Sequence, residues 1–149
     1  MRILLQKVTE GRVRVQGETI GEIGPGYVLL VGVGDGDGEA EADRLAKKVA
    51  NLRLFPDQAG KFDRSLLDVA GGALVVSQFT LYADARKGRR PSFIQAARPE
   101  VAEPLVNHFA ARLRTLGVER VETGRFQAMM DVEIHNDGPV TIWLDSAEI

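Results

Sequence analysis

The run Leu74-Val75-Val76-Ser77-Gln78-Phe79-Thr80-Leu81-Tyr82 is the most strand-like stretch of the chain, and the prediction of the fold starts from it. Its first three residues are apolar without alternation, which is typical of a strand covered on both faces. Ser77, Gln78 and Thr80 then stand where a core strand would continue with Val or Ile, and we expect the strand to continue through them. Such a segment brings side chains and backbone N–H groups to the rim of a pocket, whereas a strand that simply runs into solvent would show the same pattern.

Length and composition predict one domain, 1–149, of ordinary globular character. The chain has 149 residues, of which 44% are hydrophobic and 27% charged, and its net charge is -2. Affinity for nucleic acid would therefore have to come from a local patch. No cysteine is present, which excludes disulfides, thiolate metal sites and a cysteine nucleophile. No signal-like or membrane-spanning stretch is found, so we expect a cytoplasmic protein without a membrane partner.

Alternating and continuous apolar patterns predict a series of strands. They are expected at 3–8, 12–16, 19–23, 27–33, 52–55, 118–123, 131–136 and 140–144. Thr9-Glu10-Gly11 is expected to end the first strand, and Asn136-Asp137-Gly138-Pro139 is a turn signal between the last two.

Two helices are predicted from apolar spacing of the 3.6-residue type. The first has Asp37 as N-cap, acidic residues in its first turn, and runs to about Asn51. The second opens at Pro99 and closes at Gly117, with a wide apolar face between them.

The only concentrated positive charge lies directly after the polar end of the central run. Its members are Arg86, Lys87, Arg89 and Arg90. Held in a loop, these side chains could bind the phosphates of a nucleic acid, whose counterions would be released. A solvated surface is the more frequent fate of such a charge run, and both interpretations stay open from the residues alone.

No general base or metal site can be identified from the residues. His108 lies beside the apolar stripe of the second helix and His135 on the outward phase of its strand, so neither is expected to act as acid, base or ligand. The stretch 34–38 fails the calcium-loop pattern, and no paired ligand spacing is present. A hydroxyl such as that of Ser77 or Thr80 lacks the neighbouring base that activates a nucleophile.

Two separated motifs together resemble the signature of the D-aminoacyl-tRNA deacylases. They are Ser77-Gln78-Phe79-Thr80-Leu81 and Asn136-Asp137-Gly138-Pro139-Val140-Thr141, and the likeness extends over nearly the whole chain. The resemblance implies a homodimer whose sites lie at the subunit interface, with a cis Gly138–Pro139 bond inserted from the partner. Its carbonyls would hold the α-amino group of the substrate and leave no space for an L side chain. Glycyl-tRNA, whose amino acid is achiral, would still enter.

The resemblance also assigns roles to residues. Gln78, Phe79 and Thr80 are the expected catalytic residues, and those expected to bind substrate are Ser77, Gly138, Pro139, Asn136, Met130 and Lys7. Either Thr80 is a nucleophile, or backbone N–H groups near Phe79, with Gln78, bind the terminal adenosine and polarise the ester while the RNA 2′-hydroxyl assists water. Because no base for Thr80 is found, we favour the second mechanism.

Two positions depart from the family pattern. Lys7 replaces the usual Arg, which is thought to brace the Gly-Pro turn, and lysine cannot form the same two-pronged contact. Gln127 stands where relatives have a small residue, beside Met130.

We therefore expect a mixed α/β fold in three layers, α/β/β, with two packed sheets and two helices on one outer face. The expected activity is hydrolysis of the ester of D-aminoacyl-tRNA and glycyl-tRNA without metal or cofactor. The tRNA acceptor end is the expected partner, with no DNA, and the basic loop at 86–90 is its expected phosphate contact. The alternatives are a non-catalytic RNA- or nucleotide-binding module on the same scaffold and a general esterase.

Overall fold

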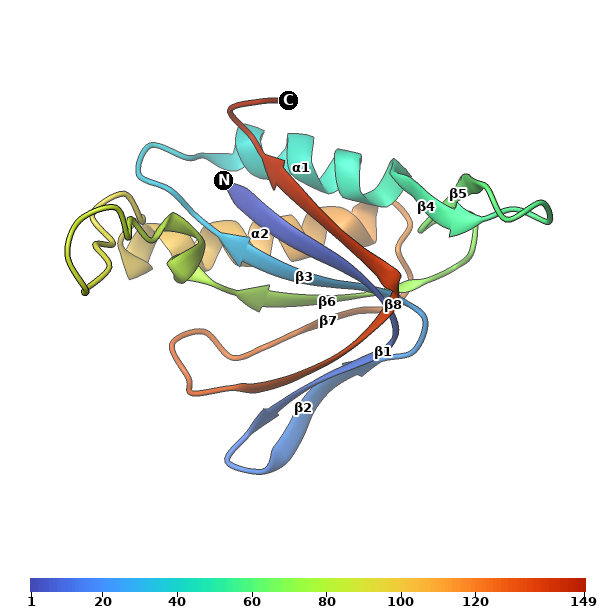
Figure 1. The fold of residues 1–149 in the computed structure, drawn as a ribbon, viewed down its shortest axis with the longest axis horizontal. Coiled ribbons are helices and arrows are strands. Elements are labelled where there is room, and N and C mark those ends of the chain that lie inside the picture. Colours follow the sequence, from blue (N-terminus) through green and yellow to red (C-terminus); the bar gives the residue numbers. More distant parts are fainter.

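The computed structural model describes residues 1–149 as a mixed α/β fold with one large sheet, one small sheet and two helices (Figure 1). The strands are β1 Arg2–Val15, β2 Glu18–Ile23, β3 Gly26–Gly32, β4 Arg53–Pro56, β5 Phe62–Ser65, β6 Gly72–Ser77, β7 Val121–Thr123 and β8 Asp131–Asp145. The helices are α1 Glu39–Asn51 and α2 Pro99–Thr115, and a 3₁₀ turn, η1, spans Phe79–Tyr82. No helix has both the length and the apolar character that crossing a membrane requires.

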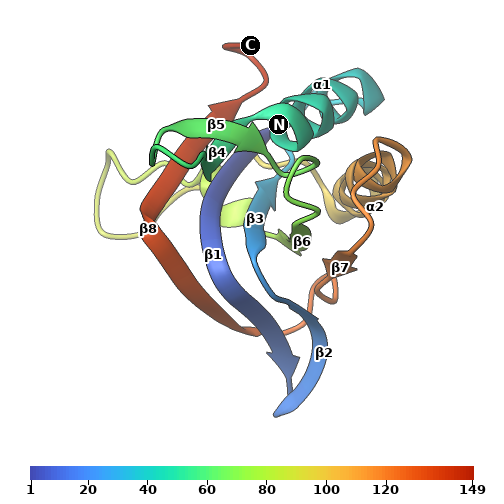
Figure 2. The same cartoon turned by 90° about the vertical axis from the view of Figure 1, so that its right-hand side faces the viewer.

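The large sheet has the order β2-β1-β3-β6-β7, with β8 on the other edge of β1. One edge of β1 pairs with β3 over its first half and with β2 over its second half, while β8 follows the opposite edge along almost the whole strand. The two long strands, β1 and β8, therefore run through both the part of the sheet that contains β3 and the part that contains β2, and the sheet bends along them (Figure 2). The small sheet is the separate hairpin β4–β5.

Two apolar cores confirm the expected α/β/β layering. Along β6, Ala73 and Val75 face the larger core, which is shared with the helices, and Leu74 and Val76 face the smaller one. The smaller core lies between β3 and β6 and the folded-over half of the sheet, and its buried members are Val8, Val13, Ile23, Val28, Leu74 and Val76. The apolar half of the central run is therefore buried on both faces, as its lack of alternation predicts.

The predicted division of the first and last strands is wrong. β1 is one strand from Arg2 to Val15, and Thr9 and Glu10 lie inside it, where register shifts interrupt the pairing with β8. β8 likewise runs through the predicted turn. The residues between Asn136 and Thr141 form a bulge, and Lys7 is the one residue of β1 that lies opposite them. A turn signal inside paired strands thus produces a bulge in place of a chain reversal.

The polar half of the central run is not a strand either. β6 ends at Ser77 and η1 begins at Phe79, because the neighbouring strand β3 ends at Gly32 and the Gln78 N–H makes a last bond, of 2.8 Å, to the Val31 carbonyl. Without a further partner strand, the chain leaves the sheet and forms the 3₁₀ turn η1.

The predicted N-cap of the first helix is one residue off. Gly38 is the N-cap, and its N–H donates to Glu41 Oε2 at 2.9 Å. The Asp37 carboxylate instead accepts the Gly34 N–H at 2.6 Å and pairs with the amino group of Met1 at 2.5 Å. The second helix begins at Pro99 as predicted, and Gly117 after it has a φ of 107°.

Candidate active site

A cleft of about 650 Å³ opens where β6 passes into η1. Ser77, Gln78, Phe79 and Met130 are among the residues that line it, whereas Thr80 is not. The remaining lining is mostly apolar, from the end of β3, the start of α2 and the segment before β8: Val33, Val76, Phe93, Ala96, Ala97, Pro99, Ala102, Phe126, Gln127, Ala128, Met129 and Val132. A concave apolar site with polar groups on one side is the usual form of a small-molecule pocket.

The η1 turn presents backbone donors beside this cleft. Phe79 and Thr80 begin the turn, so their N–H groups have no acceptor inside it. The Phe79 ring is half exposed and packs edge-on against Phe93, with 5.0 Å between the centroids. The Gln78 carboxamide donates a hydrogen bond to the Thr80 hydroxyl oxygen. Two free N–H groups on a fixed turn are the arrangement that stabilises a developing oxyanion.

Both histidines lie away from the cleft. His108 Nε2 is 2.8 Å from Asp43 Oδ1, in a contact between the two helices. His135 Nδ1 is 3.4 Å from Glu10 Oε1, where β8 pairs with β1. No group of three or more His, Asp or Glu side chains is arranged to hold a metal ion.

The Gly-Pro turn is shaped by contacts within its own bulge. The Gly138–Pro139 bond is cis, as predicted, and both residues are exposed. The Val140 N–H donates to Asn136 Oδ1 at 2.9 Å, and Asn136 Nδ2 donates to the Thr141 hydroxyl at 3.0 Å. The Asn136 amide is thus engaged within the turn.

Lys7 braces the same turn through a carboxylate. Its Nζ lies 3.3 Å from Asp137 Oδ2, and its side chain is only 8% exposed. The ammonium also lies 5.5 Å from the ring centroid of Phe55 and 6.0 Å from that of Phe62. Lysine therefore reaches the bulge here with one contact where arginine could make two.

The two motifs lie well apart in the sheet within one chain. Ser77 pairs with Val31, which faces Ile3, whereas the Gly-Pro turn faces Lys7, four residues further along β1. The offset is about 13 Å along the strands. The strands β6, β3, β1 and β8 add three spacings, about 14 Å, across the sheet. One chain alone does not bring Gly138 and Pro139 to its own cleft.

Comparisons with known proteins identify the family. The family model described as D-Tyr-tRNA(Tyr) deacylase matches residues 4–145. A D-aminoacyl-tRNA deacylase of Thermomicrobium roseum is 66% identical over 149 residues, covering 100% of this chain and 96% of that protein. The chain belongs to the D-aminoacyl-tRNA deacylase family. The predicted family is confirmed, and with it the prediction that the chain is an enzyme, an ester hydrolase by its family.

A further member of the family and two solved structures are also similar to this chain. The D-aminoacyl-tRNA deacylase of Bacillus pumilus is 54% identical over 99% of this chain and 100% of its own. The structure of a protein named c-Myc DNA Unwinding Element Binding Protein superposes with a TM-score of 0.91 at 41% identity, over 97% of this chain and 98% of that chain. A structure described as "a probable eukaryotic D-amino acid tRNA deacylase" has a TM-score of 0.83 at 18% identity, over 96% of this chain and 97% of that one, and shares the fold.

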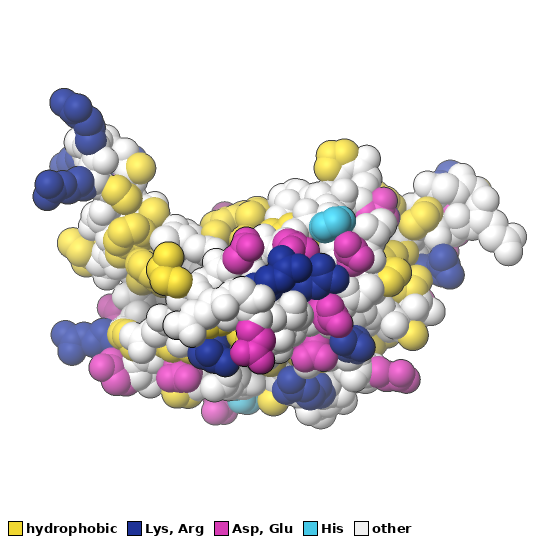
Figure 3. All heavy atoms as spheres, turned by 90° about the horizontal axis from the view of Figure 1, so that it is seen from below, with side chains coloured by type: hydrophobic (Ala, Val, Ile, Leu, Met, Phe, Trp, Pro, Cys, Tyr) yellow, Lys and Arg dark blue, Asp and Glu magenta, His cyan; other side chains and the backbone are white.

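The basic loop of this deacylase projects from the body (Figure 1), and Lys and Arg side chains gather at that end in Figure 3. Asp84 and Ser92 close the loop with paired backbone bonds of 2.8 and 2.9 Å. The Arg86 guanidinium makes two hydrogen bonds to the Asp84 carboxylate, of 2.8 and 2.7 Å, and lowers the pKa of Asp84 to about 2. Of the four cations, Lys87, Arg89 and Arg90 are therefore left free of a carboxylate partner.

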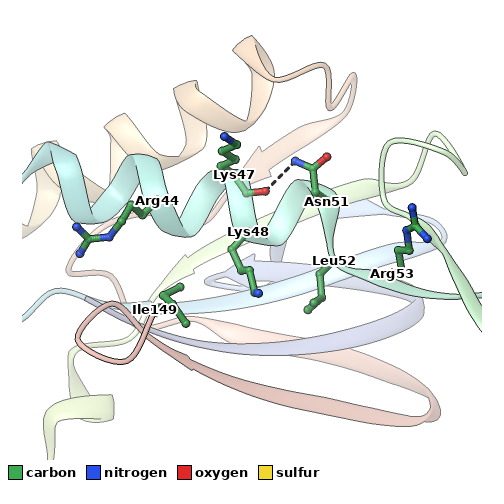
Figure 4. A pocket seen from close by; sticks show the side chains of 7 residues that line it. All are labelled: Arg44, Lys47, Lys48, Asn51, Leu52, Arg53 and Ile149. Atoms are coloured by element: carbon green, nitrogen blue, oxygen red, sulfur yellow. Dashed lines mark hydrogen bonds between the residues drawn. The ribbon is translucent and has the colours of Figure 1, made fainter.

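A second cleft, of about 630 Å³, lies along α1 and brings no catalytic groups together (Figure 4). Lys48, Leu52 and Ile149 point into the same space, while Lys47 and Asn51 point the other way. Asn51 Nδ2 donates to the Lys47 carbonyl at 2.9 Å. No hydroxyl or carboxylate side chain lines this cleft, and we assign it no part in the chemistry.

The sequence-based prediction of the site missed most of the apolar wall. Phe93, Phe126 and Val132 line the cleft although no pattern singles them out. One signal was available at Gly124, where an added Cβ would lie 2.7 Å from Met130 Sδ. Glycine there lets Met130 approach the chain and close the cleft.

Proposed function

We propose that this deacylase hydrolyses the ester between a D-amino acid, or glycine, and the terminal adenosine of tRNA, as a homodimer with two composite sites. The separation of the two motifs within one chain carries the proposal. A second copy related by two-fold symmetry can bring its Gly138–Pro139 turn to the cleft at Ser77–Thr80, and the reverse contact forms at once.

Selection against L-amino acids follows from the exposed backbone of the turn. The carbonyls of Gly138 and Pro139 hold the α-amino group, so that the L side chain would run into the turn while hydrogen, as in glycine, fits. Asn136 and Lys7, which fix the bulge from inside, support such a rigid barrier. Rejection of the wrong substrate by a clash suits an enzyme that meets a large excess of L-aminoacyl-tRNA.

Hydrolysis is proposed to use the η1 turn and the RNA itself. Water adds to the ester carbonyl, and the N–H groups of Phe79 and Thr80 stabilise the oxyanion. The Gln78 side chain binds the terminal adenosine. The neighbouring 2′-hydroxyl of the ribose assists the attack of water. The C–O bond then breaks, the amino acid leaves as its acid, and the 3′-oxygen takes up a proton.

The free cations of the basic loop are proposed to contact phosphates of the acceptor end. Lys87, Arg89 and Arg90 project on the side of η1, which they follow directly in the chain. Such contacts strengthen binding of any tRNA without choosing among amino acids. The function places the protein in the cytoplasm, where aminoacyl-tRNA is used.

The deciding experiment compares D-tyrosyl-tRNA, L-tyrosyl-tRNA and glycyl-tRNA as substrates of the purified protein. We expect release of D-tyrosine and glycine and no release of L-tyrosine. A non-catalytic RNA-binding module would retain all three esters, and a general esterase would also cleave small esters that lack adenosine. Release of D- and L-tyrosine at equal rates would refute the proposed selection.

A further inference from the structure

The η1 turn rests directly on the backbone at the end of β3. An added Cβ at Gly32 would lie 3.0 Å from the Gln78 carbonyl oxygen and 3.1 Å from Leu81 Cβ. At Gly34 it would lie 2.6 Å from the Tyr82 ring. The turn is thus supported from one side by glycines, which allow this close approach, and it has no partner strand to hold its direction.

Arg2 holds the turn from β1. Its Nη1 donates to the Leu81 carbonyl at 3.1 Å, while its Nε donates to Asp145 Oδ2 at 3.0 Å. The guanidinium carbon also lies 4.3 Å from the centroid of the Tyr82 ring and 5.6 Å from that of Trp143. One planar cation therefore ties η1 to the end of β8, a geometry for which arginine is suited and lysine is not.

The partners of Arg2 are themselves fixed. Burial by itself raises the pKa of Asp145, but the Ala147 N–H and the Arg2 guanidinium outweigh it, so this pKa is lowered and the carboxylate stays charged. Burial, and then the charges of Asp37 and Asp145, raise the pKa of Tyr82. Its hydroxyl stays protonated and donates to Asp37 Oδ2 at 3.3 Å. Both ends of the contact are thus anchored to the main sheet and the loop before α1.

We infer that Arg2 is a positioning residue for the deacylation reaction: by bonding the Leu81 carbonyl it fixes the direction of the Phe79 and Thr80 N–H groups. Arg2 does not line the cleft, so it acts through the turn and does not touch the substrate. The inference rests on the proposed function of those N–H groups. Small displacements of such donors cost catalysis more than binding, because the oxyanion forms only during the reaction.

The test uses Arg2→Lys, which keeps the charge, and Arg2→Met, which keeps much of the shape but no donor. Steady-state release of D-tyrosine from D-tyrosyl-tRNA gives kcat, and a non-hydrolysable 3′-amide analogue gives Kd. We expect kcat to fall by about tenfold to a hundredfold in both variants. We expect Kd for the analogue to change by less than about twofold, because the cleft itself is intact.

Arg12→Lys is the matched control, because Arg12 lies on the same strand and also bonds two acceptors, the carboxylates of Glu22 and Glu133, but away from η1. We expect its kcat to equal that of the unaltered protein. An unchanged kcat in Arg2→Lys and Arg2→Met, or a fall matched by an equal loss of folded protein in circular dichroism, would overturn the inference. If the unaltered protein released no D-tyrosine, the proposed function would fail instead, so the two failures are distinguishable.

Discussion

At the scale of single residues, the Thr80 hydroxyl belongs to η1, the turn proposed to stabilise the oxyanion, yet it is already engaged. It accepts a hydrogen bond from Gln78, and no His, Asp or Glu contacts it. A threonine nucleophile needs a base to remove its proton, whereas a hydroxyl that takes no part in the reaction does not. The contact with Gln78 instead fixes the carboxamide beside the cleft.

We therefore predict that Thr80→Val retains deacylation of D-tyrosyl-tRNA to within about tenfold, since it removes one hydrogen bond that orients Gln78. Thr80→Ser, which keeps the hydroxyl, should be equal to the unaltered protein. Single-turnover assays measure both. A loss of about a thousandfold in Thr80→Val, with folding and tRNA binding intact, would instead identify Thr80 as the nucleophile.

Lys7 is the second residue whose role can be isolated. Its ammonium is nearly buried and its carboxylate partner Asp137 lies in the bulge. Lys7→Met should lower the release of D-tyrosine about tenfold by loosening the turn. Lys7→Arg should leave it unchanged, because a guanidinium can make the same contact. Equal activity in Lys7→Met and Lys7→Arg, with the same thermal stability, would show that the turn needs no cationic brace.

At the scale of elements, the sequence predicts most of the helices and strands. It fails where pairing with a neighbouring strand determines where a strand ends. The helix from Pro99 and the buried half of β6 follow from periodicity alone. The passage from β6 into η1 does not, because it depends on β3 ending at Gly32, a fact about a partner strand. For the same reason Thr9 and Glu10 belong to β1: pairing with β8 on either side carries the strand through two polar residues.

The site divides in the same way. The polarity of Ser77, Gln78 and Thr80 predicts a pocket rim, and the structure has Ser77 and Gln78, but not Thr80, in the lining of the cleft. Phe93 and Phe126 come from loops far apart in the chain, and only the tertiary fold makes them neighbours. An apolar residue in a loop has no local pattern from which its role can be predicted.

The basic loop makes a prediction about salt. Changing Arg89 and Arg90 together to Gln should weaken tRNA binding and reduce the slope of log Kd against log salt by about 1.5, if each contacts one phosphate. Arg86→Gln is the control, because Arg86 is already neutralised by Asp84, and its slope should stay near that of the unaltered loop. A slope unchanged in the double variant would exclude the loop from the phosphate contact.

The same loop makes a prediction about pH. The pKa of Asp84 is lowered from 3.8 to about 2 by the hydrogen bonds from Arg86. The stabilisation of the loop is therefore fully present above 3.8 and is lost as the pH falls through about 2. Carbon NMR of the Asp84 carboxyl group should show this low midpoint, and Arg86→Gln should move it back towards 3.8. A midpoint that Arg86→Gln leaves in place would contradict the assigned cause.

At the scale of the whole molecule, β1 and β8 act as a rigid spacer between the two halves of the proposed site. Both strands run through the two layers, and the two cores fix their bend. The cleft at the end of β6 and the bulge of β8 are therefore held at a constant separation. In a two-fold dimer, each chain would use its cleft with the partner's bulge, so both sites depend on one interface.

This arrangement predicts that two inactive variants restore each other. Gly138→Ala should distort the bulge, since the residue has a φ of 126° and its added Cβ would lie 3.2 Å from Val140 N, and Gln78→Ala should impair the cleft. Each alone should lose at least about tenfold in D-tyrosine release. After subunit exchange at equal concentrations, half of the dimers are mixed, and each mixed dimer holds one site with both changes and one with neither. The mixture should regain about a quarter of the unaltered activity. Each variant taken through the same exchange alone is the control. A mixture no more active than the mean of its two components would mean that each chain builds its site alone.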